Sequence, residues 1–242
     1  MRVLTFNIHK GFNWSNKKLT IQYLKDQLRD MHPELVFLQE VVGENLELAK
    51  TQKDWVENQF EYLADELWSE FAYAKNAVYD KRHHGNVILS KYPIIETETI
   101  DISTNSFEQR GVLFCRLEIE NKFLDCYCVH LDLTQKGREK QYDALQAIIA
   151  RKSDHDSKII IAGDFNDWNQ KACDYLIQED NFLEAHKFVH GQYAKTFPAQ
   201  LPMLCLDRMY TRGINIRNIQ VLKTKPWKSI SDHLPLLAEV DL

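Results

Sequence analysis

Apolar and polar positions along the chain follow two periods, which predict strands interspersed with helices. Strand patterns cover residues 2–9, 35–38, 71–75, 86–90, 94–102, 111–119, 122–130, 158–162, 205–211, 214–222 and 234–241. Helical patterns cover residues 17–31, 45–68, 135–152 and 169–178. Ser15 or Asn16 is the expected N-cap of the first helix. A tight turn at Glu120 and Asn121 predicts a hairpin between the strands on either side.

The order of these elements indicates a mixed α/β fold. Strict alternation of strand and helix would predict one parallel sheet, but the hairpin over 111–130 argues against it. Two mixed, mainly antiparallel sheets packed face to face, with helices outside, fit the order better. No internal repeat, linker or charge block divides the chain, so we expect a single domain over residues 1–242.

Composition narrows the class of protein. Of 242 residues, 44% are hydrophobic and 27% are charged, which excludes a disordered chain. There is no apolar run of the ~18 residues that a transmembrane helix needs. The N-terminus turns polar too soon for a signal peptide, and the five cysteines are an odd count. We therefore expect a cytoplasmic monomer with reduced thiols, in which Cys126 and Cys128 share one face of a strand.

Polar residues recur where the predicted strands end. This set comprises Asn7, His9, Gln39, Glu40, His130, Asp132, Asp164, Asn166, Asp207, Asp232 and His233. The ends of neighbouring strands meet in space, so we expect one pocket. Carboxylate and amide oxygens select Mg²⁺ or Mn²⁺, and an Asp–His pair can exchange a proton near pH 7. Together these groups predict metal-assisted hydrolysis of a phosphoester.

Seven short motifs in order resemble the endonuclease/exonuclease/phosphatase superfamily, which includes deoxyribonucleases, repair nucleases, sphingomyelinases and inositol phosphatases. They are Thr5–Gly11 (TFNIHKG), Leu38–Val41 (LQEV), Gly85–Ser90 (GNVILS), Val129–Leu131 (VHL), Gly163–Asn166 (GDFN), Leu206–Arg208 (LDR) and Ser231–His233 (SDH). The motifs extend over nearly the whole chain. The resemblance implies a four-layer α/β sandwich, in agreement with the mixed pattern.

The resemblance also implies a metal site. By position, Glu40 matches the principal metal ligand and Asn7 the amide beside it. Asp232 matches an aspartate associated with the metal. Asp164 matches the carboxylate that orients the attacking water or holds a second metal. Mg²⁺, or Mn²⁺ in its place, is the implied cofactor.

Further matches imply groups around the phosphate. His233 matches a general base or phosphate ligand, and Asp207 matches the carboxylate that orients it. Asn166 matches an amide on the scissile phosphate. His130 matches an acid or phosphate clamp, and Arg110 resembles an arginine that faces the phosphate in some members. The implied partner is a phosphoester substrate.

One position departs from the repair nucleases. His9 stands where those enzymes usually have a metal-associated aspartate, so its role is either at a second metal or in a supporting hydrogen bond. We treat the adjacent His83 and His84 as a solvated loop rather than a metal pair, and Asn86 as a turn residue.

Three functions stay open at this point. The first is a metal-dependent phosphodiesterase on DNA, RNA or nucleotides, which the basic segment 223–228 favours. The second is a lipid or inositol phosphoesterase, which His130 permits. The third is a non-catalytic binding protein on the same fold, although no catalytic position is missing.

The net charge of −5 argues against a strongly basic nucleic-acid clamp. Five acidic residues fall in or beside the predicted metal site, namely Glu40, Asp132, Asp164, Asp207 and Asp232. Without them, 30 acidic residues balance 30 basic ones. A nucleic-acid substrate would therefore be held weakly, through the metal and a few basic side chains.

Overall fold

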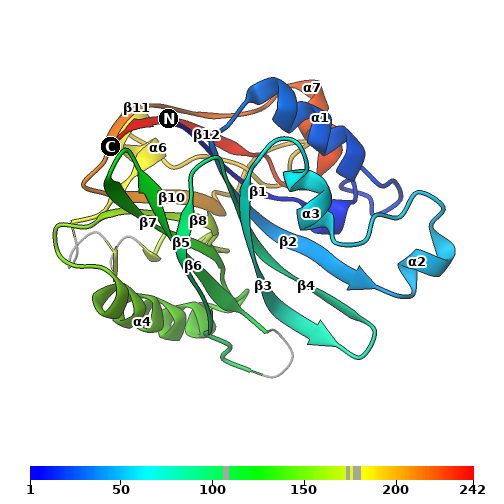
Figure 1. Cartoon of the computed structure of the whole chain (residues 1–242), viewed down its shortest axis with the longest axis horizontal. Helices are drawn as coiled ribbons and strands as arrows, with labels where there is room; N and C mark the ends of the chain where they lie inside the picture. The colour runs from blue at the N-terminus through cyan, green and yellow to red at the C-terminus, as the bar shows by residue number, and fades with distance from the viewer. Residues whose placement is uncertain (106–108, 173–174, 177–180) are drawn as a thin grey trace.

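The structure is a computed structural model that describes residues 1–105, 109–172, 175–176 and 181–242. Within these ranges the strands form two six-stranded sheets that pack face to face (Figure 1). The first sheet has the order β11 (Asn215–Val221), β12 (Leu236–Asp241), β1 (Arg2–Asn7), β2 (Leu35–Asn45), β4 (Arg82–Ser90) and β3 (Glu70–Tyr79). The second has the order β5 (Ile94–Asp101), β6 (Gly111–Ile119), β7 (Lys122–His130), β8 (Lys158–Asp164), β10 (Asp207–Arg212) and β9 (Leu183–Glu184).

Both sheets are mixed and mainly antiparallel, as the sequence predicts. β1 and β2 run parallel in the first sheet, and β7 and β8 run parallel in the second. The other described strand pairs are antiparallel. The predicted hairpin is confirmed, because β6 and β7 pair throughout and join at Glu120 and Asn121, which both adopt positive φ.

Helices flank the two sheets. Among the described residues they are α1 (Ile21–Met31), α2 (Leu48–Thr51), α3 (Gln59–Ala64), α4 (Gln135–Lys152), α6 (Ala185–His190) and α7 (Lys225–Ile230), with a 3₁₀ turn, η1, at His9–Gly11. α6 contributes Ala185 to the apolar layer between the sheets. α1, α3 and α7 pack on the first sheet and α4 on the second. These helices and the two sheets form the predicted α/β sandwich (Figure 1).

Three apolar layers hold the sandwich together. One lies between the sheets, and Cys126 and Cys128 lie in it together, as their alternation predicts. The second lies under α1, where Leu24 and Leu28 are buried, and the third lies under α4. Burial of these side chains supplies the main favourable free energy of folding. The cysteines that the structure describes are all free thiols, and Cys173 lies outside the described residues.

The predicted helix over 45–68 is wrong. β2 extends seven residues beyond the predicted end at Leu38, because its second half pairs with β4 as far as Asn45 and Arg82. Asn58 has φ 47°, outside the helical region, and its backbone N–H donates to the Gly43 carbonyl oxygen at 2.8 Å. Only the short helices α2 and α3 form in this range. Pairing within the sheet therefore overrides the helical spacing of the apolar residues.

The predicted first helix begins too early, and neither Ser15 nor Asn16 caps it. The Asn13 Oδ1 atom accepts the backbone N–H groups of Lys17 and Lys18, which closes a turn before the helix. α1 begins at Ile21, so Thr20 occupies the capping position. The Thr20 hydroxyl donates instead to the Ile230 carbonyl oxygen at 2.7 Å. This contact ties the helix to the segment that carries the last sequence motif.

Other boundaries also shift. The strand predicted over 2–9 ends at Asn7, and β3 and β4 both extend past the predicted ranges. The basic segment 223–228 is partly helical, because it runs into α7. The helix predicted over 169–178 includes 173–174 and 177–178, which lie outside the described residues. Of the helices that are described, none has the length and apolar character needed to cross a membrane.

Candidate active site

Three neighbouring strands of the second sheet end in polar side chains at the same level. His130 ends β7, Asp164 ends β8 and Asp207 begins β10, and the register places Asp164 beside both. Gly163 allows β7 and β8 to approach this closely, because a Cβ there would lie 1.9 Å from the Val129 carbonyl oxygen. Strand register alone therefore brings two carboxylates and one imidazole together.

The first sheet contributes Asn7 from the end of β1 and Glu40 from within β2. Asn7 is the last residue of β1, and β2 is irregular between Leu38 and Val41. Glu40 lies in that irregularity with φ 57°, a left-handed conformation that is uncommon for glutamate. Such bulges redirect side chains. Here the Glu40 carboxylate reaches the Asn7 amide, with 3.4 Å between Oε1 and Nδ2.

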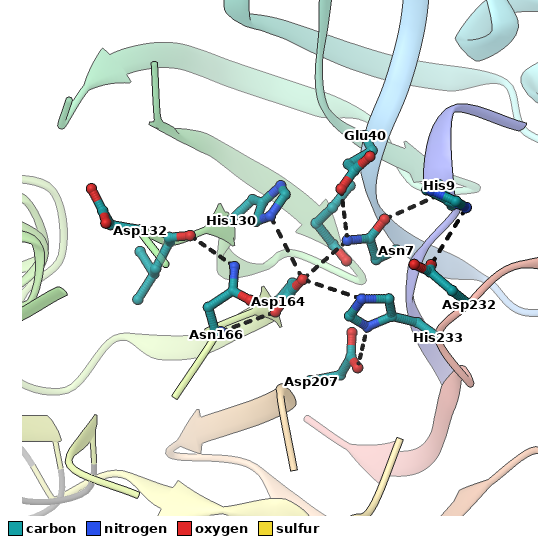
Figure 2. Close-up of polar contacts among 12 residues, drawn as sticks. Asn7, His9, Glu40, His130, Asp132, Asp164, Asn166, Asp207, Asp232 and His233 are labelled. Carbon is teal, nitrogen blue, oxygen red and sulfur yellow. Dashed lines mark hydrogen bonds and ion pairs between the residues drawn. The ribbon is translucent and has the colours of Figure 1, made fainter. Parts of the chain in front are cut away.

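The Asp164 carboxylate lies at the centre of the site (Figure 2). Its Oδ2 atom accepts a hydrogen bond from Asn7 Nδ2 at 3.0 Å and lies 3.6 Å from His130 Nε2 and 3.7 Å from His233 Nε2. Its Oδ1 atom accepts the Asn166 backbone N–H at 2.9 Å. Residues from both sheets thus converge on one buried carboxylate.

His233 is held from both sides. Its Nδ1 atom lies 2.9 Å from Asp207 Oδ2, and its ring packs on Phe197 with centroids 4.9 Å apart. Its backbone N–H donates to the Ser231 hydroxyl, which itself donates to the Asn7 carbonyl oxygen at 2.8 Å. The ring therefore presents Nε2 toward Asp164, in a fixed orientation.

The remaining predicted residues are Asn166, Asp232, His9 and Asp132, and they differ in burial and in hydrogen-bond partners. Asn166 is buried and donates its amide to the Leu131 carbonyl oxygen at 3.0 Å. Asp232 is partly exposed and lies 3.6 Å from His9 Nδ1, while the His9 backbone N–H donates to Asn7 Oδ1 (Figure 2). Asp132 turns away from the cluster, because its carboxylate accepts the Thr134 backbone N–H at 2.6 Å.

The buried aspartate and histidine have shifted pKa values. Burial raises the pKa of Asp164 to about 6, although His233 acts in the opposite direction. Burial disfavours the protonated His233 ring, but Asp207 and Asp164 outweigh it and raise the pKa of His233 to about 10. In the metal-free protein His233 is therefore a cation at neutral pH, able to donate a proton or bind an anion.

Around Glu40 and His130 the pKa shifts have the opposite sign to those of Asp164 and His233. Burial opposes ionisation of Glu40, but the Lys10 ammonium outweighs it and holds the Glu40 pKa well below its ordinary value. The Lys10 ammonium is 2.8 Å from Glu40 Oε2. Burial keeps the pKa of His130 well below its ordinary value, and Arg110 adds to this effect. His130 is therefore neutral, in contrast to His233.

The donor atoms suit a hard divalent cation. Asn7 Nδ2 lies between the Glu40 and Asp164 carboxylates, so a cation that replaced this N–H₂ group there would have oxygen ligands on both sides. Among the residues that the structure describes, Asp164, Asp207 and His233 form a compact trio whose ligand atoms lie within 4.8 Å of one another. The Asp207 Oδ1 atom in that trio is buried without a hydrogen-bond partner.

Four polar residues near the site had no predicted role in it or were interpreted differently. Lys10 lies in the first motif, but its reach to Glu40 depends on the 3₁₀ turn. His83 and His84 lie within β4, not in a solvated loop, and the pKa of His84 is lowered to about 4 by burial and by Lys10. Asn86 is also in β4, not a turn, and joins the two sheets.

Comparison with known proteins agrees with this arrangement. The model of the endonuclease/exonuclease/phosphatase family matches residues 4–233. The chain belongs to this family. Members of the family generally hydrolyse phosphoesters, and most depend on a divalent metal. The resemblance seen in the seven motifs is thereby confirmed.

A protein from Escherichia coli strain K12, YbhP, is 40% identical over 244 residues, covering 100% of this chain and 96% of YbhP. Solved structures of the family share the fold at much lower identity. A family protein from Beutenbergia cavernae aligns with TM-score 0.81 at 17% identity, over 100% of this chain and 71% of that one. The mannosyl-6-phosphatase Bt3783 of Bacteroides thetaiotaomicron aligns with TM-score 0.75 at 14% identity, over 100% of both chains.

A third structure, humanized D. rerio TDP2, aligns with TM-score 0.75 at 16% identity, over 100% of this chain and 99% of that one. A further D. rerio TDP2 structure contains a single-strand DNA product. These likenesses establish the fold of the chain.

Proposed function

We propose that this protein is a divalent-metal-dependent phosphodiesterase that acts on nucleic acid or nucleotides. The convergence of both sheets on the Asp164 carboxylate carries the proposal. Two histidines, His130 and His233, lie within 4 Å of one oxygen of that carboxylate and differ in protonation. A cationic and a neutral imidazole beside one carboxylate give the site proton donors and acceptors at neutral pH.

Glu40, Asn7, Asp164 and Asp232 would hold the metal. A bound Mg²⁺ or Mn²⁺ would neutralise charge on the phosphate and polarise its P–O bonds. The Asp164 carboxylate is buried and faces both histidines, so it would orient the water that attacks phosphorus and accept its proton. The bond from that water oxygen to phosphorus forms as the bond to the leaving oxygen breaks.

The histidines and Asn166 would act on the phosphate. The His233 Nε2–H group, oriented through Asp207, donates to a phosphate oxygen that gains negative charge. The buried Asn166 lies two residues after Asp164. Its side-chain amide donates one N–H to the Leu131 carbonyl oxygen and would donate the other to a second phosphate oxygen. Arg110 adds positive charge on the His130 side. We place these groups in one site within a single domain.

A lipid phosphoester is the second candidate substrate, favoured by one feature. Phe197, which packs on His233, accepts backbone hydrogen bonds from Met203 and Leu204 at 2.8 Å each. Leu201 and Met203 in this loop are 67% and 60% exposed. Exposed apolar side chains next to the site could contact acyl chains.

The test uses the purified full chain with Mg²⁺ or Mn²⁺. Bis-p-nitrophenyl phosphate, labelled single- and double-stranded DNA and RNA, and a short-chain lipid phosphodiester are offered in parallel. We expect hydrolysis of the nucleic-acid or p-nitrophenyl substrates, removal of that activity by EDTA and loss of at least about 100-fold in Glu40→Gln.

Glu44→Gln is the matched control, because Glu44 also lies in β2 but is exposed. It should retain activity within about twofold. The proposal fails if no nucleic-acid or p-nitrophenyl substrate is cleaved, or if Glu40→Gln cleaves as fast as the unmodified protein. Preferential turnover of the lipid would favour the second candidate.

A further inference from the structure

Two neighbouring loops carry the groups that would face the phosphate. Loop 131–134 follows β7, and loop 165–168 follows β8 and includes Asn166. The loops contact each other through two hydrogen bonds. The Leu131 backbone N–H donates to the Asp164 carbonyl oxygen at 2.9 Å, and the Asn166 amide donates to the Leu131 carbonyl oxygen at 3.0 Å. The place of the Asn166 amide therefore depends on how the two loops lie relative to each other.

A single buried arginine, Arg138 on α4, contacts both loops. Its side chain is 1% exposed, and its Nη1 atom donates to the carbonyl oxygens of Asp132 and Leu133 at 3.1 and 2.8 Å. On the second loop its guanidinium carbon lies 4.6 Å from the centre of the Trp168 ring. Its Nε atom lies 4.0 Å from Asp167 Oδ1. A planar guanidinium group suits contacts in several directions at once.

The Asp167 carboxylate is the second part of this support. It is also 1% exposed, and its Oδ2 atom accepts the Ala172 backbone N–H at 2.8 Å. Its Oδ1 atom is buried and accepts no hydrogen bond, and Arg138 Nη2 is likewise buried without an acceptor. Arg208 Nη2 contacts the Asp167 carbonyl oxygen at 3.4 Å and not the carboxylate. Loss of Arg138 would therefore leave a buried carboxylate without its ion pair, which is unfavourable.

Asp167 directly follows Asn166 in the chain, so this anchor acts on the residue next to the phosphate donor. Asn166 has φ 49°, a left-handed conformation that asparagine tolerates. Its side chain lies beside Asp164 in the site (Figure 2), whereas the Asp167 side chain turns toward α4. The peptide between the two residues is planar. A fixed Asp167 carboxylate therefore restricts the Asn166 backbone.

We propose that Arg138 and Asp167 are positioning residues that hold the Asn166 amide where it can donate to the scissile phosphate. Both side chains are buried under the loops, so they act through Asn166 and not on the substrate. A misplaced donor weakens stabilisation of the charge that develops in the transition state, and it affects ground-state binding much less. The loss should then fall on kcat. This inference rests on the proposed function and extends that site to α4.

The first test measures kcat and KM of Arg138→Met for bis-p-nitrophenyl phosphate with Mg²⁺ or Mn²⁺. We expect kcat to fall by about 10- to 100-fold, since one such donor contributes roughly 100- to 1000-fold, and KM to change by less than about threefold. Asp167→Asn keeps the side-chain volume and an acceptor for Ala172, and it should show the same pattern. It replaces Arg138→Met if circular dichroism shows that the arginine variant does not fold.

Arg151→Met is the matched control. Arg151 is an exposed arginine on the same helix, where it pairs with Glu98. This variant should keep kcat within about twofold of wild type. Wild-type kcat in Arg138→Met and Asp167→Asn, or a change confined to KM, overturns the proposal.

A double-mutant cycle distinguishes positioning from a general loss of structure. Arg138→Met, or Asp167→Asn in its place, is combined with Asn166→Ala. If the buried pair acts through the Asn166 amide, its loss should lower kcat by less than about twofold once that amide is absent. An equal loss of kcat in the presence and absence of the amide would overturn the proposal.

The last test separates this inference from the proposed function. The ¹H–¹⁵N signal of the Asn166 side-chain amide, assigned by its absence in Asn166→Ala, is followed in the metal-free full chain. We expect it to shift in Arg138→Met and Asp167→Asn, with exchange against water about tenfold faster, and to stay unchanged in Arg151→Met. That result without hydrolysis of any phosphodiester would leave the positioning role and remove the phosphodiesterase. An unchanged Asn166 signal in both variants overturns the inference, even in an active enzyme.

Discussion

Asp207 shows how one residue acts through another. It is fully buried at the start of β10, where strand register places it beside Asp164, and its Oδ2 atom fixes His233 Nδ1 at 2.9 Å. Its charge is also the largest of the effects that raise the pKa of His233. Removal of that charge would change both the orientation and the protonation of the ring.

We therefore expect Asp207→Asn to lower kcat for bis-p-nitrophenyl phosphate by about 100-fold or more while the fold is kept. The far-UV circular dichroism spectrum should be unchanged, and a ¹H–¹⁵N titration of the metal-free protein should show a lower His233 pKa. Asp30→Asn, an exposed carboxylate on α1, serves as control. Wild-type turnover in Asp207→Asn would contradict the assigned role.

At this scale the sequence indicates which residue types meet but not how they pair. The strand-end motifs predict that Asp164, Asp207 and His233 are near one another, because the ends of neighbouring strands converge. The contact between Lys10 and Glu40 depends on two left-handed residues in different segments. Such backbone conformations leave little signal in the sequence, since neither residue is a glycine.

At the scale of elements, Asp132 holds the segment that leads from His130, at the end of β7, into α4. Asp132 Oδ1 accepts the Thr134 backbone N–H and hydroxyl, and the Thr134 hydroxyl accepts the Gly137 N–H at 3.1 Å. The Thr104 hydroxyl donates to Asp132 Oδ2 at 2.8 Å. Burial opposes ionisation of Asp132, but these donors lower its pKa below the ordinary value of 3.8.

A carboxyl group whose pKa falls on folding stabilises the protein above its unfolded pKa, and this contribution is lost as the pH falls through the folded pKa. We expect Asp132→Asn to lower the free energy of unfolding at pH 7 by about 1 kcal/mol. The difference from wild type should shrink below pH 3.8.

Urea titrations at neutral pH and at about pH 3 measure this difference. Asp143→Asn, exposed on α4, is the control and should behave as wild type at both values. A difference that is constant with pH would show that the Asp132 charge does not stabilise the fold.

Elements were predictable where local pattern and tertiary pairing agree. The hairpin over 111–130 and the helix over 135–152 appear as predicted, because their apolar faces and turn residues specify the same structure. The helix predicted over 45–68 is wrong because residues up to Asn45 pair with β4 in the sheet. Long-range pairing of this kind cannot be read from helical spacing.

At the scale of the whole molecule, the site depends on how the two sheets are held together. Asn86 in β4 is fully buried, and its Nδ2 atom donates to the carbonyl oxygens of Gly111 and Cys128 at 3.0 and 3.1 Å. Both acceptors belong to the second sheet. One amide thus links the sheet that carries Glu40 to the sheet that carries Asp164.

Asn86→Ala would leave the Gly111 and Cys128 carbonyl groups buried without this donor, which costs about 1–3 kcal/mol of unfolding free energy. Asn86→Asp should cost more, because a carboxylate would face two carbonyl oxygens in an apolar layer. Urea unfolding followed by tryptophan fluorescence measures both values. Asn218→Ala, an exposed asparagine on β11, should stay within about 0.5 kcal/mol of wild type. If Asn86→Ala is as stable as that control, the amide does not hold the sheets together, and their alignment at the site must come from the apolar layer alone.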